Sequence, residues 1–439
     1  MKKVLFASII LFSATASAQV DISGSRFMQI SPAASTGLQA VYVIENSADA
    51  TIEYTASTSS VQWQRFSNLG GGYAEPVTGV VRDGNKWSVG AGASDMGYII
   101  TDGSRQTCFW VVNYASCQWT VSGLTIAESD CDRVWLGVDG SAPEMIYYSI
   151  NGHRETLDRA IEVDYRTLAY DSESHTYVQT EVTEKLEYAD GRINLPVPLC
   201  DTDFTINPDK FASAWGIGRA VSSPSFQTSA VQAQTTATQT VRESDNEQKV
   251  ESEGLGGSAP CEIEFSAAVT DAAIYRRWEI ASTPDFVDTY LTFDQLDFTY
   301  TFTEAGTCYV RFMANNAAGS CEYLGDTYTV AIGESRLECP NAFSPGTSEG
   351  VNDEWKVSYR SIISFDCQIF NRWGQKMATL TDPSKGWDGK YNGKFVKSGV
   401  YFYVIKATGS DGKEYKLSGD INIISSRQNP NSTTGGGVQ

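Results

Sequence analysis

The sequence predicts an all-β protein built of serial β-sandwich modules, and three observations support this prediction. Gly, Tyr, Thr and Ser are frequent, while the long runs of Ala, Leu, Glu and Lys that are typical of helices are absent. Short apolar runs bounded by turn residues recur along the chain, for example at residues 108–114 and 134–138. The run at 146–150 leads into Asn151-Gly152, a two-residue hairpin signal. Repeated strands of this kind favour sandwiches over parallel βαβ units.

Composition and charge exclude several classes of function. The 439 residues correspond to about three domains. Hydrophobic residues make up 41% of the chain, enough to fill several cores. The 53 acidic residues against 33 basic ones give a net charge of −20, which repels phosphate backbones, so we expect no nucleic-acid partner. His153 and His175 are the only histidines, which weakens any hypothesis of a His-rich metal site or a catalytic triad.

The first 18 residues predict a secretory signal peptide. Lys2 and Lys3 form a short basic start, an apolar stretch follows at 4–12, and small residues at 16–18 resemble a cleavage site. No later apolar run approaches the ~18 residues that a membrane-spanning helix needs, so we expect no transmembrane segment after signal removal.

Cysteine usage agrees with export. In an oxidising compartment disulfides are the default use of cysteine, and an odd number leaves at least one thiol free or paired with another chain. No CxxC spacing occurs, so zinc-ribbon and thioredoxin-like hypotheses both fail. The nine cysteines are Cys108, Cys117, Cys131, Cys200, Cys261, Cys308, Cys321, Cys339 and Cys367.

The strand pattern predicts a β-rich module at 19–122 and a second β-sandwich module at 123–222. Cys131 and Cys200 both occupy strand-like positions of the second module, which suggests a bridge between them.

Residues 223–258 predict a linker, because the composition shifts to Ser, Thr, Gln, Glu and Gly. The part at 230–236 alternates enough to form a strand instead, so that alternative stays open.

Residues 259–335 form the third predicted module. The segment 261–265 alternates with period two, and Trp278 sits in a following strand. With the strand-ending turn at 315–321, these features resemble the PKD or immunoglobulin-like (Ig-like) domains of bacterial surface proteins. The resemblance implies a disulfide between the first strand and that turn, Cys261–Cys321.

The last module, 336–425, predicts a small sandwich. Phe365, Cys367 and Ile369 alternate with polar residues and give one apolar strand face. Cys339 precedes the first strand of the module, and a Cys339–Cys367 bridge is a further candidate.

The strand at 399–405 is apolar on both faces, which predicts that both are covered. Val400, Phe402 and Val404 share one face, and Tyr401, Tyr403 and Ile405 share the other.

The motifs at 370–374, 386–389, 392–393 and 398–404 follow one another in an order that resembles the gliding motility-associated C-terminal domain, the "type B" export signal of the type IX secretion system of Bacteroidota. The resemblance covers about a fifth of the chain. It implies that the domain acts as an address, and that the partners are the type IX translocon and a PorP/SprF-like outer-membrane protein. The residues expected to form the signal and its docking surface are Phe370, Asn371, Arg372, Trp373, Gly374, Gly386, Trp387, Asp388, Gly389, Gly399 and Tyr401.

Two features depart from that family. Its members often carry an Asn-Gly-Asp-Gly loop where this chain reads Gly-Thr-Ser-Glu-Gly at 346–350. A polar tail at 426–439, expected to be flexible, extends past the expected end of the domain. The tail leaves open whether the domain is cleaved or retained.

Other chemistry is less favoured. Asn352 and Asp353 offer oxygen ligands for a metal, but such side chains more often satisfy turn backbone groups, so we expect no metal and no cofactor. Trp110, Trp119, Trp135 and Trp278 offer a sugar-binding platform, yet tryptophans on sandwich strands more often fill cores.

The sequence therefore predicts a non-enzymatic exported protein of the type IX pathway. We expect periplasmic transit followed by a place on the cell surface or outer membrane, or release, and a binding or structural role there. The alternatives are a surface adhesin or carbohydrate-binding protein and, less favoured, a hydrolase with two carboxylates about 5–10 Å apart in one cleft.

Overall fold

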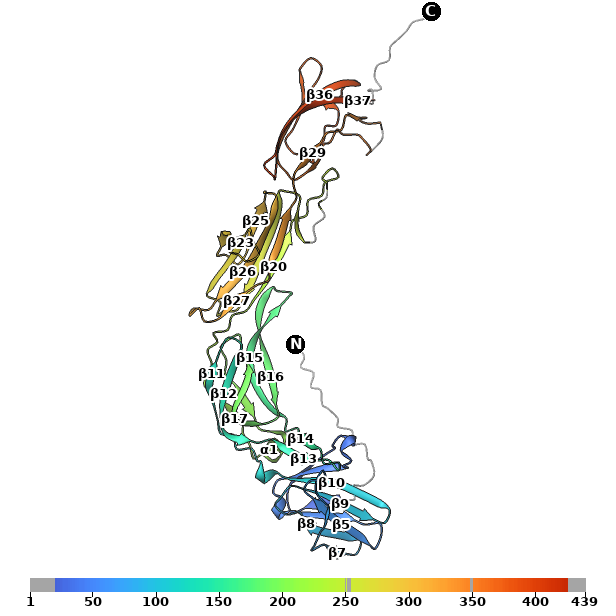
Figure 1. Ribbon diagram of the computed structural model, residues 1–439, viewed down its shortest axis with the longest axis vertical. Helices are drawn as coiled ribbons and strands as arrows, with labels where there is room; N and C mark the ends of the chain where they lie inside the picture. The colour runs from blue at the N-terminus through green and yellow to red at the C-terminus, as the bar shows by residue number, and fades with distance from the viewer. Residues whose placement is uncertain (1–19, 249, 251–253, 348–349, 425–439) are drawn as a thin grey trace, which may run out of the picture. The chain divides into compact units, whose positions relative to one another are not determined.

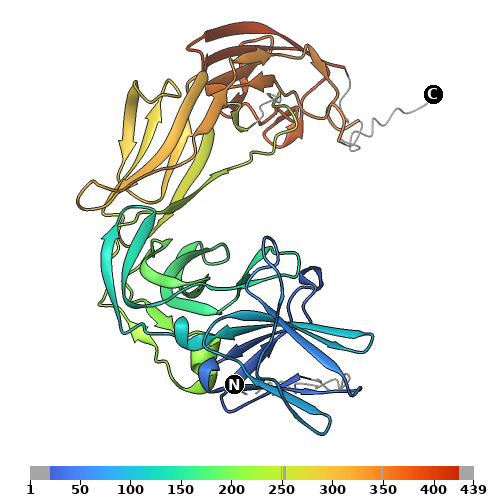
Figure 2. The same cartoon turned by 60° about the horizontal axis from the view of Figure 1, so that its bottom comes forward.

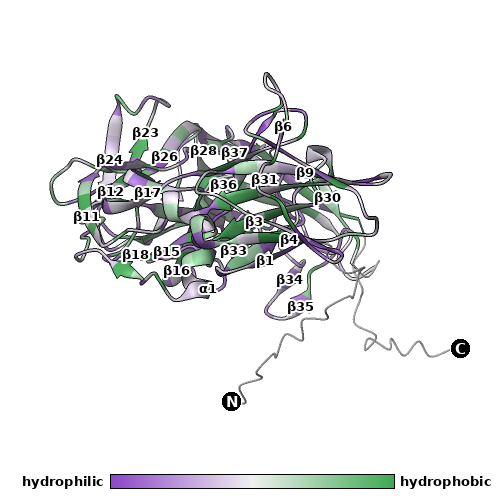
Figure 3. Ribbon diagram, turned by 90° about the horizontal axis from the view of Figure 1, so that it is seen from below, coloured by the Kyte–Doolittle hydropathy of each residue, from purple (hydrophilic) through white to green (hydrophobic). Residues whose placement is uncertain are grey.

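The computed structural model describes residues 20–248, 250, 254–347 and 350–424, so the expected signal peptide and tail lie outside the described residues. The chain divides into two compact units, one of residues 1–167 and 179–228 and the other of 168–178 and 229–439. Strands dominate throughout, which confirms the predicted all-β class of serial sandwiches (Figure 1). Colouring by hydropathy shows apolar and polar residues mixed along these strands (Figure 3).

The first module is a two-sheet sandwich, coloured blue to cyan in Figure 2. Short 3₁₀ turns lie at η1 (Ala34–Thr36), η2 (Ser47–Asp49) and η3 (Tyr114–Ser116). One sheet has the order β1 (Val20–Ser23), β4 (Thr51–Thr55), β8 (Lys86–Gly90), β7 (Val81–Asp83). The other has the order β2 (Phe27–Ile30), β3 (Ala40–Ile44), β10 (Arg105–Asn113), β9 (Met96–Asp102), β5 (Val61–Phe66), β6 (Glu75–Pro76).

The second module contains three smaller sheets and one short helix, α1 (Lys210–Trp215). The sheets are β11 (Gly123–Ser129), β12 (Arg133–Ala142), β17 (Ala189–Pro196); then β13 (Met145–Tyr148), β14 (Arg154–Leu157); then β16 (Thr176–Leu186), β15 (Ile161–Asp171), β18 (Thr205–Asn207), β19 (Val221–Ser222). The β13–β14 hairpin turns at the predicted Asn151-Gly152 position.

The first two modules share a hydrophobic core, which explains the continuous apolar run in β10. Phe109 and Val111 pack inside the first sandwich, whereas Trp110 and Val112 on the opposite face join the core of the second module. A strand buried on both faces carries apolar residues at every position rather than at every second one. The two modules therefore fold around one continuous interior.

A buried polar network lies at this shared core. Arg159 and Asp209 are both fully buried and form a salt bridge, and the Arg159 guanidinium also donates to the Cys117 carbonyl oxygen at 2.9 Å. The Tyr114 hydroxyl lies 3.0 Å from Asp209 Oδ2, and the same carboxylate caps α1. Burial, followed by the charge of Asp209, raises the pKa of Tyr114. Burial of both charges is tolerated because each has several polar partners.

The third module is a sandwich whose first strand corrects the linker prediction. Its sheets are β20 (Ala233–Gln239), β22 (Cys261–Val269), β25 (Phe298–Phe302), and β21 (Leu255–Gly257), β28 (Tyr328–Ile332), β26 (Gly306–Asn315), β23 (Tyr275–Ala281), β24 (Thr289–Phe293), with β27 (Glu322–Leu324) beside β26. Residues 223–258 were expected to form a linker, but β20 pairs with β22 and β21 pairs with β28. The alternating small and polar residues of β20 are compatible with a strand at the edge of a sheet. Composition alone was therefore a misleading basis for predicting a linker here.

Trp278 is fully buried at the centre of this module. Its ring contacts Phe265, Phe298 and Phe312, and its indole N–H donates to the Leu296 carbonyl oxygen at 2.9 Å. Trp278 therefore fills the core of the module, as expected for a tryptophan on a sandwich strand.

The predicted disulfide pairs are wrong. Cys131 and Cys321 are disulfide-bonded, but their expected partners Cys200 and Cys261 are free thiols. The strand-like position of a cysteine does not identify its disulfide partner, because connectivity cannot be deduced from sequence spacing.

The Cys339–Cys367 bridge is also absent. Both thiols are free and belong to the core of the C-terminal domain. Burial, with smaller contributions from neighbouring Cys339 and Asp366, raises the pKa of Cys367 to about 12. Both cysteines therefore serve as core residues in this structure.

The C-terminal domain is built on one five-stranded sheet, in the order β30 (Ala342–Phe343), β37 (Glu414–Ile423), β36 (Gly399–Gly409), β32 (Ile362–Phe370), β33 (Lys376–Leu380). Two small hairpin-like sheets complete it: β29 (Arg336–Glu338) with β31 (Ser358–Arg360), and β34 (Lys390–Tyr391) with β35 (Lys394–Phe395). The core between them draws all its described residues from Leu337 to Ile423. The domain thus has an interior of its own.

Residues 244–248 form a polar strap on this domain. Gln248 N donates to the Tyr359 carbonyl oxygen at 2.7 Å, and Tyr359 N donates to the Asn246 carbonyl oxygen at 3.1 Å. Asn246 Nδ2 donates to the carbonyl oxygens of Val357 and Pro383 at 2.7 and 2.8 Å. The strap therefore extends the β29–β31 sheet by one short segment from the third module.

Candidate functional site: the outer sheet face of the C-terminal domain

Two buried tryptophans hold the C-terminal domain together. Trp355 and Trp387 exchange backbone hydrogen bonds at 2.9 and 3.0 Å, and their indole N–H groups donate to the carbonyl oxygens of Pro340 and Lys390. Tyr401 on β36 packs its ring 5.3 Å from that of Trp387. Large aromatic rings whose indole N–H groups are hydrogen-bonded are suited to this buried central position.

The Trp387-Asp388-Gly389 motif is a structural corner. Asp388 Oδ1 accepts from Lys390 N at 3.0 Å, and its other oxygen accepts from Lys390 Nζ at 2.9 Å. Gly389 has φ of +70°, and a Cβ there would lie 2.8 Å from Pro345 Cγ. Only glycine fits this corner without displacing its neighbours.

The Asn371–Gln375 turn has the opposite character and displays an aromatic ring. Asn371 Oδ1 accepts from the backbone N–H of Trp373 and of Gln375, both at 3.0 Å, and Gly374 takes φ of +79°. These features fix the turn and leave the Trp373 side chain 79% exposed. The Arg372 guanidinium lies 5.1 Å from the centre of that ring, so the turn presents a cation and an aromatic face together.

The outer face of the five-stranded sheet is apolar along its central strand. Val400, Phe402 and Val404 are 43%, 43% and 44% exposed, whereas Tyr401 and Ile405 face the core. The prediction that both faces of this strand are covered is therefore wrong. The inner face is buried by β29, β31 and the segments that carry Trp355 and Trp387, and the outer face is at the surface.

Register places further residues beside this apolar strip. Phe402 pairs with Phe370 on β32 and with Asp420 on β37, and Val404 pairs with Gln368 and Ser418. We call Val400, Phe402, Val404 and Phe370, together with Trp373 of the adjoining turn, the outer strip. Monomeric proteins seldom keep a row of large apolar side chains on a sheet face in water without a partner.

The predicted docking residues divide into two groups. Arg372, Trp373 and Gly374 are exposed, and they lie at the end of the outer strip. Trp387, Gly389 and Tyr401 are buried and shape the core, while Phe370, Asn371, Gly386, Asp388 and Gly399 are half-buried. The motif therefore combines residues that build the domain with a few that it displays.

Sequence reasoning missed the exposure of Val400, Phe402 and Val404. A signal was present in the neighbouring strand β37, whose residues 416, 418, 420 and 422 are polar while the intervening ones are mostly apolar. That alternation indicates a sheet with one solvated face, and antiparallel pairing places the three β36 residues on it.

The weak metal candidates act as turn residues. Asp353 accepts backbone N–H groups of Gly346 and Gly350 at 2.9 and 2.7 Å, which uses both carboxylate oxygens, and the Asn352 carbonyl oxygen accepts from Ser344 N. Within the described ranges, no group of three acidic, His or Cys side chains is arranged to hold a metal.

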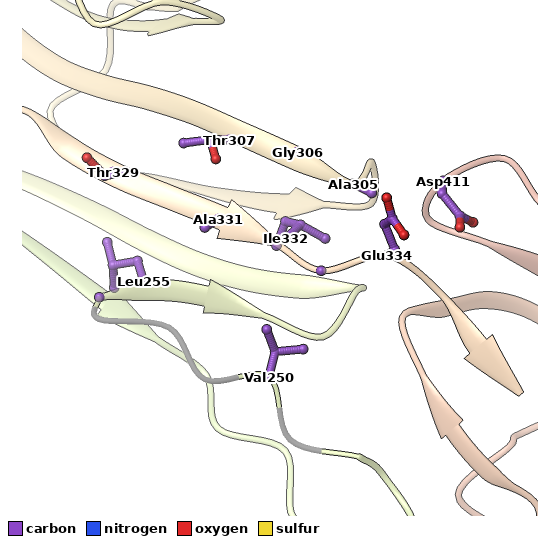
Figure 4. Close-up of a pocket in the computed structure, with 12 residues that line it drawn as sticks. Val250, Leu255, Ala305, Gly306, Thr307, Thr329, Ala331, Ile332, Glu334 and Asp411 are labelled. Carbon is purple, nitrogen blue, oxygen red and sulfur yellow. The ribbon is translucent and has the colours of Figure 1, made fainter.

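A cavity of about 850 Å³ lies where the third module adjoins the C-terminal domain (Figure 4). Its acidic side chains are Glu334 and Asp411, which are both exposed, and the opposite part is lined by Val250 and Leu255. Burial acts to raise the pKa of Asp411, but hydrogen bonds from Ser335 and neighbouring amides outweigh it, so the pKa is lowered. A general acid needs the opposite shift, so the cavity does not favour hydrolysis.

The tryptophans considered as a sugar platform are parts of cores. Trp110, Trp119 and Trp278 are buried, and the half-buried Trp135 is covered by the Arg192 guanidinium at 5.3 Å from its ring. They do not form an exposed coplanar surface of the kind that sugar binding requires.

Comparison with known families agrees with this division of the chain. Residues 337–423 match the CHU_C type IX secretion signal domain, and residues 124–223 match a fibronectin type III domain. The first match defines the chain as an exported protein routed by its C-terminal domain, either secreted or at the cell surface. Neither matched family is catalytic.

Solved structures give only distant matches. The chain is similar to three N-terminal domains of the bacteriophage RB49 Highly Immunogenic Outer Capsid protein (10% identity over 69% of this chain and 99% of that one, TM-score 0.22). It is also similar to dimeric latent PorU from Porphyromonas gingivalis (9% identity, 71% and 33% coverage, TM-score 0.15). A third match is a Ca²⁺-stabilized adhesin with which an Antarctic bacterium binds ice (15% identity, 94% and 100% coverage, TM-score 0.19).

No curated protein matches the chain at a significant level. Among the described residues, no helix has the length and apolarity that crossing a bilayer requires.

Proposed function

We propose that this protein is a non-enzymatic component of the type IX secretion pathway that is carried across the outer membrane by its C-terminal domain. The observation that carries the proposal is the match of residues 337–423 to a type IX secretion signal domain that has its own closed core. A signal that is recognised in its folded form must fold independently of the rest of the chain. A hydrophobic core of its own gives the domain this independence.

Residues 20–335 would act outside the outer membrane as a binding or bracing region linked to the secretion machinery. Their two sandwich-rich parts offer rigid surfaces, and the shared core of the first two modules fixes those modules to each other. The outer-membrane partner would be a PorP/SprF-like protein, with the Asn371–Gln375 turn among the residues that it contacts.

Deletion of residues 337–439 tests the address role. The truncated chain should accumulate in the periplasm, and protease added to intact cells should no longer reach it. Removal of 426–439 alone, which leaves the matched domain intact, is the control and should preserve delivery. Unchanged surface delivery of the longer deletion would refute the proposal.

A further inference from the structure

We infer that the outer strip of the C-terminal domain is a docking surface for a protein of the type IX machinery whose complementary patch is apolar and rimmed by carboxylates. This inference rests on the proposed function and assigns the recognition step to a defined face. Of the expected docking residues it uses Phe370, Arg372 and Trp373, and it leaves out the half-buried Asp388.

The first argument is that the inner face and one end of the domain are already occupied. The inner sheet face is core. The β29–β31 end binds the strap, and the turn at Ser410 donates to the Gly333 carbonyl oxygen at 3.0 Å and accepts from Ala305 N at 2.9 Å. The outer face, in contrast, stays accessible to a partner that reads the folded domain.

The second argument is the composition of that face. Phe402 and Phe370 are cross-strand neighbours, Val400 and Val404 extend the apolar row along β36, and Trp373 projects at one end. An apolar centre containing aromatic side chains, with a polar rim, is the usual composition of a protein interface. Trp and Phe anchors in such a centre commonly carry most of the binding free energy.

The third argument is charge. Residues 337–423 carry 11 Lys and Arg against 10 Asp and Glu, whereas residues 19–336 carry 19 against 43. On the outer face, Lys376 pairs in register with Phe370, Lys406 follows the strip on β36, and Arg372 lies at its end. The same face also carries Asp366 and Asp420, so a partner with carboxylates opposite the lysines and with cations opposite these two acids fits it best.

A second copy of the chain fits this face less well. Two identical strips that met about a two-fold axis would bring the same Lys and Arg rims near one another, and like charges oppose such pairing. The half-buried Asp366 and the exposed Asp420 beside the strip disfavour an anionic lipid surface.

The experiment uses the full chain expressed in a host with a type IX system. The double variant Phe402→Thr/Val404→Thr keeps β-forming residues but removes apolar contact, so it should lower the surface-exposed fraction about tenfold, as loss of one interfacial anchor does. The matched control is Val287→Thr, an exposed valine of the third module, which should export normally. Unchanged thermal unfolding of the double variant establishes that its domain is folded.

A photo-crosslinker at position 402 identifies the occupant. Capture of a type IX machinery protein, with loss of the adduct in a Lys376→Glu/Lys406→Glu background, supports the inference. Normal export of the double variant overturns it, as does an adduct with a second copy of the chain or with lipid alone. If the 337–439 deletion blocks delivery while the double variant is exported normally, only the docking surface is wrong and the proposed function stands.

Discussion

The junction between the first two modules and the junction between the third module and the C-terminal domain are built from different interactions. At the first, Trp110 and Val112 of one module enter the core of the next, and the buried Arg159–Asp209 pair is sealed inside. At the second, the strap contributes part-buried backbone and amide hydrogen bonds, and the core of the C-terminal domain stays separate.

This difference bears on function. Apolar burial makes two modules one cooperative unit, because separating them exposes surface to water. A hydrogen bond contributes only about 1 kcal/mol, because folding replaces a bond to water with a bond within the protein. The C-terminal domain is thus held in place without being merged with its neighbour, which suits a domain that a separate machinery must recognise.

The largest effect is expected at the first junction. Asp209→Ala leaves the fully buried Arg159 without its counter-charge and removes the cap of α1, which should cost about 3–5 kcal/mol of unfolding free energy. Denaturant unfolding followed by hydrogen exchange should show loss of protection in both of the first two modules together. Glu144→Ala, which breaks the exposed Arg154–Glu144 pair, should leave the unfolding free energy nearly unchanged. Loss of protection in the second module alone would contradict a common core.

A core substitution in the C-terminal domain should have a more local effect. Ile405→Ala creates a cavity on the buried face of β36 and should destabilise the domain by about 2–5 kcal/mol. Hydrogen exchange should rise across residues 337–423 while the first two modules keep their protection. Val404→Ala, one residue away on the exposed face, is the control and should be nearly neutral. An equal rise throughout residues 254–335 would show that the two cores are coupled.

Alkaline pH should weaken both regions through their buried thiols. Burial raises the pKa of Cys117 to about 11 and that of Cys367 to about 12. Because the thiol ionises near pH 8.5 in the unfolded chain, its stabilising contribution is present below that pH and declines as pH rises toward the folded pKa, by up to about 1.4 kcal/mol per pH unit. Unfolding measured at pH 8 and pH 10 should show this slope, and Cys367→Ala should reduce it in the C-terminal domain alone. A slope unchanged by that substitution would assign it to other groups.

The sequence predicted the parts of this architecture that depend on local patterns. The period of Phe365, Cys367 and Ile369 defined an apolar face, and the structure buries all three. Trp373 and Trp387 are both followed closely by glycine, yet Trp373 is exposed and Trp387 is buried. The first lies in a surface turn, and the second lies in the core of the domain. No local pattern records that difference.

The errors share one physical cause, which is dependence on distant partners. The covering of Val400 and Phe402 depends on which layer reaches each face of β36, and the pairing of Cys131 depends on tertiary proximity. Similarly, residues 233–239 form a strand only because β22 presents a free edge to them. Such information is carried by the assembled fold rather than by neighbouring residues.

The smallest effect is expected at the strap. Asn246→Ala removes two hydrogen bonds to the carbonyl oxygens of Val357 and Pro383, and it should cost about 1–2 kcal/mol because the carbonyl of the buried Val357 loses this donor. Hydrogen exchange at residues 357–361 should increase, while the core of the C-terminal domain keeps its protection. Lys356→Ala breaks the exposed pair with Asp245 and should change stability by less than about 1 kcal/mol. Global unfolding of the C-terminal domain in Asn246→Ala would mean that the strap is part of its core, and the contrast between the two junctions would then disappear.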